Sequence, residues 1–295
     1  MDGNFIIPVF ILFGLGLLFG IILSIAYRQF KVVEDPRIDV VEELLPHANC
    51  GACGEPGCRA FAERVVNEGR NPAKCTVSSP EGLTRIANYL GVAVAEEEKW
   101  VARLQCAGGI QEAHNLAKYA GGLSTCRGEA VVVGGSKDCV WGCLGLGDCA
   151  SACTFGAITM NEDGLPVVDP EKCTACNDCV EVCPKGLFQL MPISRKLIVQ
   201  CKSLLEGDLA ESKCTVACTA CSRCVVDSAP GVIEIRNNLA TINYDLNELT
   251  SPTATKRCPT GAIVWLEGNG QFEKTVRVDL PLGRVEERLR NEYFQ

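Results

Sequence analysis

The fold is decided by the stretch CTACNDCVEVCP, residues 173–184. It places three cysteines two residues apart and a fourth after three more residues, directly before a proline. Thiolates at the tight spacing can bind three corners of one iron–sulfur cube, and the fourth thiolate is then directed to a neighbouring cube. The stretch therefore predicts a pair of [4Fe-4S] clusters.

A looser run of cysteines precedes this stretch, with Leu146 where the regular spacing would place another cysteine. Bacterial ferredoxins exchange the fourth ligands of two such runs. The exchange predicts one cluster on Cys139, Cys143, Cys149 and Cys183, and another on Cys153, Cys173, Cys176 and Cys179. Structural zinc is the alternative, but zinc sites usually draw on two separated Cys-x2-Cys pairs, so iron–sulfur clusters are favoured.

The sequence repeats itself from residue 139 onward. A glycine precedes a short β-like run at four places, spaced by 30, 45 and 30 residues: Gly156, Gly186, Gly231 and Gly261. A shift of 75 residues carries Cys139 onto Cys214, Cys143 onto Cys218, Cys149 onto Cys224 and Cys183 onto Cys258 without a gap. Such a repeat predicts two related ferredoxin-like units.

The second unit keeps ligands for one cluster, on Cys218, Cys221, Cys224 and the remote Cys258. Cys214 competes with Cys258 as the fourth ligand, but Pro259 and the match to Cys183 favour Cys258. The positions of the other cluster read Ser228, Glu248, Ser251 and Ala254, so that cluster is expected to be missing, with side chains filling its space.

Another cysteine motif lies far before these units, at Cys50, Cys53, Cys58 and Cys75. The glycines Gly51, Gly54 and Gly57 let the backbone approach a cluster closely, and Cys58 falls at a predicted helix start, where the helix dipole favours an anion. Four cysteines remain, Cys106, Cys126, Cys201 and Cys214. For these, buried or free thiols are the favoured interpretation, although Cys214 matches Cys139 in the repeat.

One segment is built to cross a membrane. Phe5 to Tyr27 contains no charged side chain and would span a hydrocarbon core of about 30 Å as a helix. The basic residues Arg28, Lys31 and Arg37 follow it, which predicts that the rest of the chain is cytoplasmic. Disulfides are disfavoured in that compartment, so metal ligation is favoured over disulfides as the use of most of the 20 cysteines.

Capping residues predict three further helices. One begins at Asp35 and Pro36 and ends at Pro46, one runs from near Pro56 or Gly57 to about Gly69, and one runs from Ser79 and Pro80 to Gly91. The net charge of −8 makes a nucleic-acid binder an unlikely class.

We expect an α+β protein with one N-terminal transmembrane helix, a small mainly helical [4Fe-4S] domain and two ferredoxin-like units. The expected domains are a transmembrane anchor at 1–28, a four-cysteine domain at 29–95, a linker at 96–135, a two-cluster unit at 136–200, and a degenerate one-cluster unit with a tail at 201–295.

The order of these parts, together with the segment LPHANCGACGEPGC at 45–58, resembles the B-type subunit of the Rnf electron-transport complex over nearly the whole chain. The altered run from Cys143 to Cys149 is also similar to that family, whereas Thr154 departs from it, since a proline usually follows the cysteine there. The resemblance implies a [4Fe-4S] cluster on Cys50, Cys53, Cys58 and Cys75, and hence four clusters in the chain.

The resemblance further implies a relay subunit in a membrane complex that passes electrons between ferredoxin and NAD, coupled to Na⁺ or H⁺ translocation. Its partners would be the other membrane and peripheral subunits and soluble ferredoxin, with no nucleic acid. Flavin and nicotinamide would sit on other subunits. The location would be the bacterial inner membrane, with the soluble domains in the cytoplasm.

Two alternatives stay open at this stage. A polyferredoxin subunit of another membrane oxidoreductase, such as a hydrogenase-like complex, would use the same chemistry. A zinc-binding membrane scaffold belongs to a different class and predicts a colourless protein. The basic residues Arg195, Lys196 and Lys202 are a candidate docking site for an acidic ferredoxin, or equally the solvated edge of a hairpin.

Overall fold

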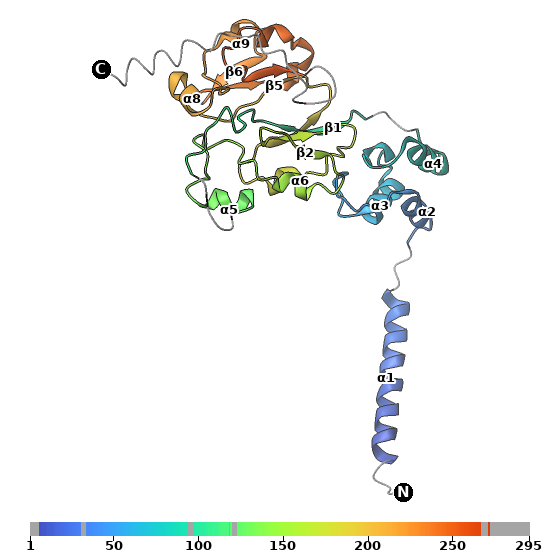
Figure 1. The fold of residues 1–295 in the computed structure, drawn as a ribbon. Helices are drawn as coiled ribbons and strands as arrows, with labels where there is room; N and C mark the ends of the chain where they lie inside the picture. The colour runs from blue at the N-terminus through green and yellow to red at the C-terminus, as the bar shows by residue number, and fades with distance from the viewer. Residues whose placement is uncertain are drawn as a thin grey trace, which may run out of the picture. The chain divides into compact units, whose positions relative to one another are not determined.

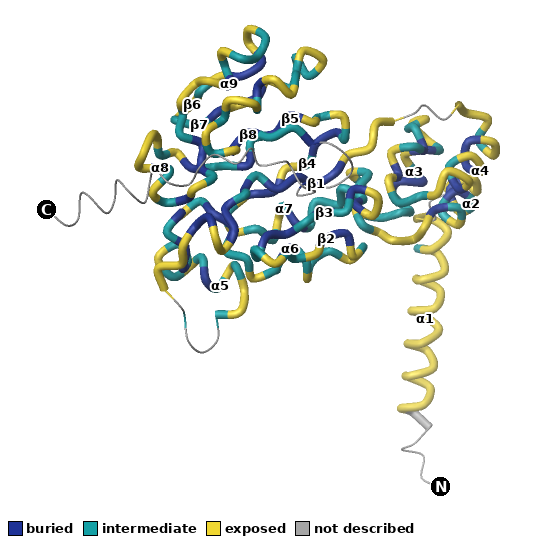
Figure 2. The backbone as a smooth tube through the Cα atoms, turned by 45° about the horizontal axis from the view of Figure 1, so that its top comes forward, coloured by how far each residue is buried: buried dark blue, intermediate teal, exposed yellow. Residues whose placement is uncertain are grey.

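A computed structural model describes residues 6–30, 34–93, 97–117, 119, 123–266 and 271. Its first element is helix α1, Ile6–Phe30. The segment Pro8–Phe30 has a mean hydropathy of 2.7, and no part of it is buried, as the exposed tube of α1 in Figure 2 shows. Among the described residues this is the one helix long and apolar enough to cross a membrane.

The chain divides into two compact units. The first comprises the described residues of 1–49, 56–72 and 79–94, and the second those of 50–55, 73–78 and 95–295. The division passes through the expected four-cysteine domain, because the short segments at 50–55 and 73–78 belong to the second unit.

Three helices build the core of the first unit: α2, Arg37–Leu44; α3, Cys58–Glu68; and α4, Pro80–Leu90. Their inward faces bury Val41, Phe61 and Ile86 almost completely. The Ser79 hydroxyl accepts a hydrogen bond from Gly82 N at 3.1 Å and caps α4. Gly69 and Gly91 end α3 and α4 in the left-handed conformation, so the predicted boundaries of both helices are confirmed.

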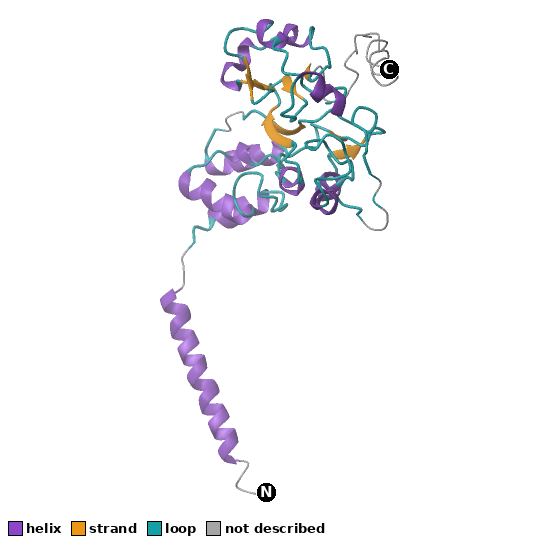
Figure 3. Ribbon diagram, turned by 90° about the vertical axis from the view of Figure 1, so that its left-hand side faces the viewer, coloured by secondary structure: helices purple, strands orange, loops and turns teal. Residues whose placement is uncertain are grey.

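The second unit carries all eight described strands, in four antiparallel pairs (Figures 1 and 3). β1, Trp100–Leu104, pairs with β4, Phe188–Pro192, and β2, Ile158–Met160, pairs with β3, Pro166–Val168. β5, Leu197–Val199, pairs with β8, Ile263–Trp265, and β6, Ile233–Arg236, pairs with β7, Leu239–Ile242.

Short helices connect these strands. They are α5, Cys126–Val131; α6, Asp148–Ala152; α7, Asp178–Val182; α8, Gly207–Lys213; and α9, Arg223–Val226. Three turns are 3₁₀ helices: η1, Pro72–Lys74; η2, Tyr244–Leu249; and η3, Pro252–Thr255. Each of the four repeat glycines has a positive φ, between 57° and 82°, so the same tight turn precedes each of the four short runs.

The strands form two ferredoxin-like modules. The first module, residues 100–192, closes β1 onto β4, and the second module, residues 197–265, closes β5 onto β8. β1 therefore lies in the stretch expected to be a linker, and β5 lies in the range expected for the first ferredoxin-like unit. Apart from Gln271, the expected tail beyond residue 266 is outside the described residues.

Candidate metal centres

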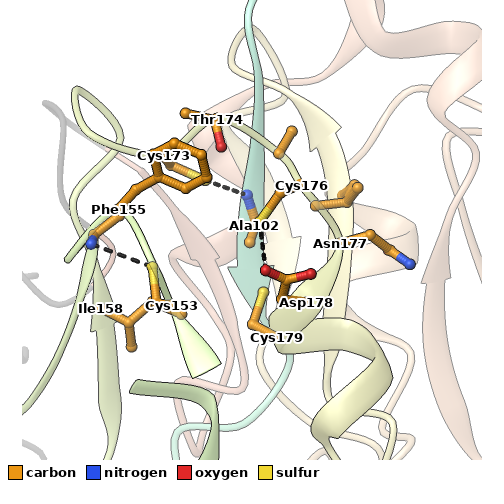
Figure 4. Close-up of a pocket in the computed structure, with 13 residues that line it drawn as sticks. Ala102, Cys153, Phe155, Ile158, Cys173, Thr174, Cys176, Asn177, Asp178 and Cys179 are labelled. Carbon is orange, nitrogen blue, oxygen red and sulfur yellow. Dashed lines mark hydrogen bonds between the residues drawn. The ribbon is translucent and has the colours of Figure 1, made fainter. Parts of the chain in front are cut away.

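The first candidate site is a pocket lined by four cysteines (Figure 4). Cys173 and Cys176 lie in the loop that leads into α7, Cys179 lies in the first turn of α7, and Cys153 follows the end of α6. Ala102, Phe155 and Ile158 supply apolar walls. The pocket thus gathers one complete set of thiols that the exchange of fourth ligands predicts for a [4Fe-4S] cluster.

The backbone of the tight cysteine loop has an unusual conformation. Ala175 and Asn177, on either side of Cys176, have φ angles of 57° and 79°. Ala220 and Ser222, on either side of Cys221, repeat this with 56° and 58°. Left-handed conformations are costly for residues other than glycine and concentrate at functional sites, where successive amides can be directed toward an anion. The loops therefore fit an anionic cluster.

Backbone amides also donate to the cysteine sulfurs. Ala102 N donates to Cys173 Sγ at 3.5 Å, and Ala157 N donates to Cys153 Sγ at 3.3 Å. Leu187 N donates to Cys183 Sγ at 3.4 Å in the equivalent turn. Such bonds favour the thiolate over the thiol, and hydrogen bonds to sulfur tune the potential of a cluster.

Burial opposes the charged form of these thiols. It raises the pKa of Cys179 to about 12, and the neighbouring Cys173 and Cys176 contribute to that rise. Burial likewise raises the pKa of Cys143 and of Cys149 to about 12. Four thiolates cannot share such a site without a compensating cation, so these residues suit iron, which displaces the protons.

The second module has one equivalent pocket, lined by Cys218, Cys221, Cys224 and Cys258. Cys258 comes from the far end of the module, after η3. Cys214, the competing fourth ligand, does not line this pocket and lies instead in a separate buried cluster with Cys139.

Side chains occupy the position of the missing second cluster. Ala254, the counterpart of Cys179, is 1% exposed within the module core, against which Tyr244 and Leu246 pack. The Ser251 hydroxyl accepts a hydrogen bond from Thr253 N and caps η3, so this side chain is used in a helix cap. The space of the lost cluster is thus filled by the protein itself.

The four cysteines of the N-terminal motif belong to both units. Cys58 begins α3 in the first unit, where its amide donates to Asn49 Oδ1 at 2.8 Å. Cys50, Cys53 and Cys75 belong to the second unit. Burial raises the pKa of Cys53, and the thiols of Cys75 and Cys50 raise it further, so these three side chains influence one another.

Two features were not predicted from the sequence. Arg127 N donates to Asp148 Oδ2 at 3.2 Å, which brings the neighbouring Cys126 to the loop where the regular cysteine is missing. Cys139, expected beside Cys143, packs with Cys214 in the buried cluster that Cys201 also contacts. The gap at Leu146 was the available signal for the first feature, and the match of Cys139 to Cys214 was the signal for the second.

The described residues do not bring any three His, Cys, Asp or Glu side chains together in a group suited to a single metal ion. Two protein families match the cysteine motifs. Residues 45–77 match the family described as a putative Fe-S cluster, and residues 138–187 match the 4Fe-4S dicluster domain. These matches show an iron–sulfur protein with [4Fe-4S] domains.

Curated relatives match over most of the chain. The chain is 44% identical to the B-type subunit of the Na⁺-translocating ferredoxin:NAD⁺ oxidoreductase complex of Acetobacterium woodii, over 81% of this chain and 72% of that protein. It is 38% identical to the B-type subunit of the ion-translocating oxidoreductase complex of Methanosarcina acetivorans, over 83% of this chain and 92% of that protein. It is 34% identical to the B-type subunit of the proton-translocating ferredoxin:NAD⁺ oxidoreductase complex of Clostridium ljungdahlii, over 84% of this chain and 88% of that protein.

The order of apolar helix, four-cysteine motif and ferredoxin-like modules, the two four-cysteine pockets and these relatives agree. The resemblance to the Rnf family seen in the sequence is confirmed. The chain belongs to the family of B-type subunits of ion-translocating (Rnf-type) oxidoreductase complexes.

Proposed function

We propose that this chain is the iron–sulfur electron relay of a membrane complex that passes electrons between ferredoxin and NAD and couples this to Na⁺ or H⁺ translocation. The observation that carries the proposal is the pair of pockets, each lined by four cysteines of one module. Relatives named as subunits of ferredoxin:NAD⁺ oxidoreductase complexes support the choice of ferredoxin and NAD as the two electron-exchange partners. The other subunits of such a complex are its partners and carry the flavin and nicotinamide sites.

Four [4Fe-4S] clusters follow from the ligand sets. Two sets line the pockets: Cys153, Cys173, Cys176 and Cys179, and Cys218, Cys221, Cys224 and Cys258. A third is Cys50, Cys53, Cys58 and Cys75, within the matched putative Fe-S segment. The fourth contains Cys143, Cys149 and Cys183, with Cys139 as the fourth ligand on the sequence pattern.

The residues of this chain hold the thiolates, exclude water and direct amides at the sulfurs. A bound cluster supplies one-electron transfer, with no bond made or broken. One contact supports a relay between neighbouring sites: Thr76, directly after Cys75, donates from its hydroxyl to the carbonyl of Thr174, directly after Cys173, at 2.6 Å. The sites at Cys75 and Cys173 are therefore suited to exchange electrons.

Ferredoxin is proposed to dock at the basic residues Arg195, Lys196 and Lys202, which lie just before and just after β5. Arg195 lies over the ring of Tyr244, 4.4 Å from its centroid, and Lys202 Nζ donates to Gly186 O at 2.6 Å. These contacts hold two of the three basic side chains without removing their charge. Reversing all three charges, Lys196 included, should slow reduction by ferredoxin most at low salt. Equal rates across a salt series would remove this surface from the proposal.

The soluble part is proposed to face the cytoplasm, since the basic flank follows α1 and unprotected clusters need a reducing compartment. A cysteine introduced beyond residue 280 should resist an impermeant thiol reagent in intact cells and react after lysis. Labelling in intact cells would reverse the orientation.

The decisive experiment is an anaerobic purification of the full chain, followed by a visible spectrum and assays of iron and zinc. The relay function predicts a brown protein with about four irons per four-cysteine site, bleached by reduced ferredoxin. A colourless protein with stoichiometric zinc would support the scaffold class instead. Flavin identification in the native assembly separates the Rnf-type complex from a hydrogenase-like one.

A further inference from the structure

Four buried or half-buried cysteines lie where the two modules meet. Cys106 follows β1 and Cys201 follows β5 at equivalent places, since Gln105 N donates to Leu187 O at 2.8 Å and Gln200 N donates to Ala262 O at 2.7 Å. Cys139 and Cys214 are equivalent through the 75-residue repeat. Each begins the same turn: Gly142 N donates to Cys139 O, and Ala217 N donates to Cys214 O, both at 2.9 Å.

The sulfurs of Cys106 and Cys214 lie beside the same glycine, and Cys139 and Cys201 pack in the same region. A β-carbon placed on Gly108 would stand 2.9 Å from the sulfur of Cys214 and 3.8 Å from that of Cys106. Cys139 and Cys214 share a buried cluster, and Cys201 packs against it. Cys106, Cys139 and Cys214 are 6%, 8% and 6% exposed. Gly108 is thus needed because any side chain there would meet the thiols.

Backbone amides solvate these sulfurs as they do at the pockets described above. Cys143 N donates to Cys106 Sγ at 3.4 Å. Ser203 N donates to Cys201 Sγ at 3.4 Å, and Cys201 packs against the core that contains Cys218, the repeat counterpart of Cys143. Each module therefore places one of its proposed cluster ligands beside this region.

Charge in the region favours an anionic group. Lys137 is only 5% exposed, and its Nζ donates to Gly108 O at 2.6 Å, beside the thiols. A buried ammonium is costly unless an anion compensates it. Burial raises the pKa of Cys214 to about 12, and the nearby thiols of Cys106, Cys139 and Cys201 contribute to that rise. The Asp138 to Lys213 ion pair, at 2.9 Å, joins the residues just before Cys139 and Cys214.

Building on the function proposed above, we propose that Cys106, Cys139, Cys201 and Cys214 bind a fifth [4Fe-4S] cluster between the two modules. Each module supplies two of the four ligands. Four buried or half-buried thiols from four separate segments, a buried lysine and amide donors to sulfur together provide the ligand count and the charge that such a cluster needs. Ordinary buried thiols need none of these features.

The assignment releases Cys139 from the site with Cys143, Cys149 and Cys183, which then needs another ligand. Cys126 supplies it. Arg127 N, next to Cys126, donates to Asp148 Oδ2 at 3.2 Å, which brings Cys126 beside Cys149. The Cys126 thiol also contributes to the raised pKa of Cys149. Gly145 and Gly147, with φ of 76° and 78°, give the loop around Leu146 the same left-handed pair as the loops around Cys176 and Cys221. The loop keeps its cluster-binding form while Cys126 replaces the missing side chain.

The fifth cluster gives the relay a step between modules. Cys106 Sγ accepts a hydrogen bond from the amide of Cys143, and Cys201 packs against the core that contains Cys218, so the cluster would adjoin one site of each module. An electron can then pass from the first module to the second through buried groups. With this cluster, all 20 cysteines of the chain have a ligand role.

Iron content tests the proposal on the anaerobically purified and reconstituted full chain. Five clusters predict about 20 irons per chain, and four predict about 16. Cys214→Ser should remove about four irons, or convert one cluster to a three-iron form, while the Mössbauer and paramagnetic signals of the others persist. Ala113→Ser, a buried neighbour of Cys214, is the matched control and should keep the full count.

Pairs of substitutions test which cysteines share a cluster. The double variant with Cys139→Ser and Cys214→Ser should lose no more iron than either single variant, because both changes remove ligands of the same cluster. Cys139→Ser combined with Cys149→Ser should lose twice as much. Cys126→Ser combined with Cys149→Ser should again lose only one cluster. The opposite pattern, with Cys139 and Cys149 sharing a cluster, would overturn the assignment.

The outcomes separate this inference from the proposed function. A wild-type count near 16 that Cys214→Ser leaves unchanged would reject the fifth cluster and retain the relay. A chain without iron, or with zinc, would reject both. Persisting signals from the other clusters show in each variant that the protein has folded.

Discussion

The two ferredoxin-like modules share a 75-residue repeat, the same pattern of hairpins and the same closing strand pair, yet their cores differ. The first module holds four cysteines where the second holds Ala254 and its neighbours. Cys173 and Cys179 are part of the first core, whereas the second core has Ala254 in place of Cys179, with Tyr244 and Leu246 packed against that core. The fold therefore needs a filled centre, and a cluster or packed side chains can fill it.

Iron removal should produce the largest difference between the two modules. Cluster binding is coupled to folding, and the first module has two proposed cluster sites within its core while the second has one. After anaerobic chelation, the protection of amide hydrogens from exchange should fall in both strands. The fall in β2 should exceed the fall in β6 by a factor of about ten, which corresponds to about 1.4 kcal/mol of opening free energy. Hydrogen exchange read by mass spectrometry measures both strands in one sample. Equal loss would show that side-chain packing does not sustain the second module.

Truncation of two equivalent isoleucines tests the difference between the two cores more finely. Ile158 lines the cysteine pocket of the first module, and its counterpart Ile233 is 2% exposed in the apolar core of the second. Ile233→Ala should lower the free energy of unfolding by about 2 to 5 kcal/mol. Ile158→Ala should instead chiefly quicken iron loss, because it opens the pocket to water.

Denaturant unfolding and the rate of iron release to a chelator distinguish the two isoleucine variants. Val264→Ala, in the half-buried closing strand β8, serves as the control for general loss of packing. Iron loss from Ile233→Ala as fast as from Ile158→Ala would contradict the contrast between the cores.

A surface ion pair gives a smaller difference. Arg257 binds Asp227 through two nitrogens, at 2.7 and 2.5 Å, where the first module has Val182 and Ala152. Both groups are solvent-accessible, so Arg257→Ala should destabilise the second module by much less than Ile233→Ala. The difference from wild type should disappear at about 1 M salt, where charges are screened within a few ångströms. A deficit that persists at high salt would indicate lost packing.

Restoring the absent cysteines should have no effect on iron content. The variant with Ser228, Glu248, Ser251 and Ala254 all changed to cysteine should bind no additional cluster. Asn177, with φ of 79°, has Pro252 as its repeat counterpart, and proline holds φ near −65°. Thr250, the counterpart of Ala175, has φ of −70°. A gain of about four irons would show that thiols alone decide the site.

Local signals predicted the helices and the tight cysteine loops. Ser79 and Gly91 act within one turn of α4, so their effect does not depend on the rest of the chain. Spacing within residues 173–184 likewise brings three thiols together, whatever surrounds them. The 75-residue repeat predicted which strands would recur.

Long-range placement was not available from spacing. Cys126 reaches the Leu146 loop through a long connection, and Cys106 meets Cys214 only because the modules pack together. β1 was missed because its last four residues are all buried, Arg103 among them, so it has no alternation of apolar and polar side chains. The sequence therefore predicted the cluster chemistry better than the grouping of the ligands.

The left-handed residues of the cysteine loops have a consequence for the life of the protein in the cell. Ala175, Asn177, Ala220 and Ser222 each hold a conformation that costs an L-amino acid roughly 1 to 2 kcal/mol. A newly made chain without iron has nothing to offset that cost, so we expect its loops to relax and to be open to proteases until iron is inserted. The amount of this protein in the cell should then follow the supply of iron.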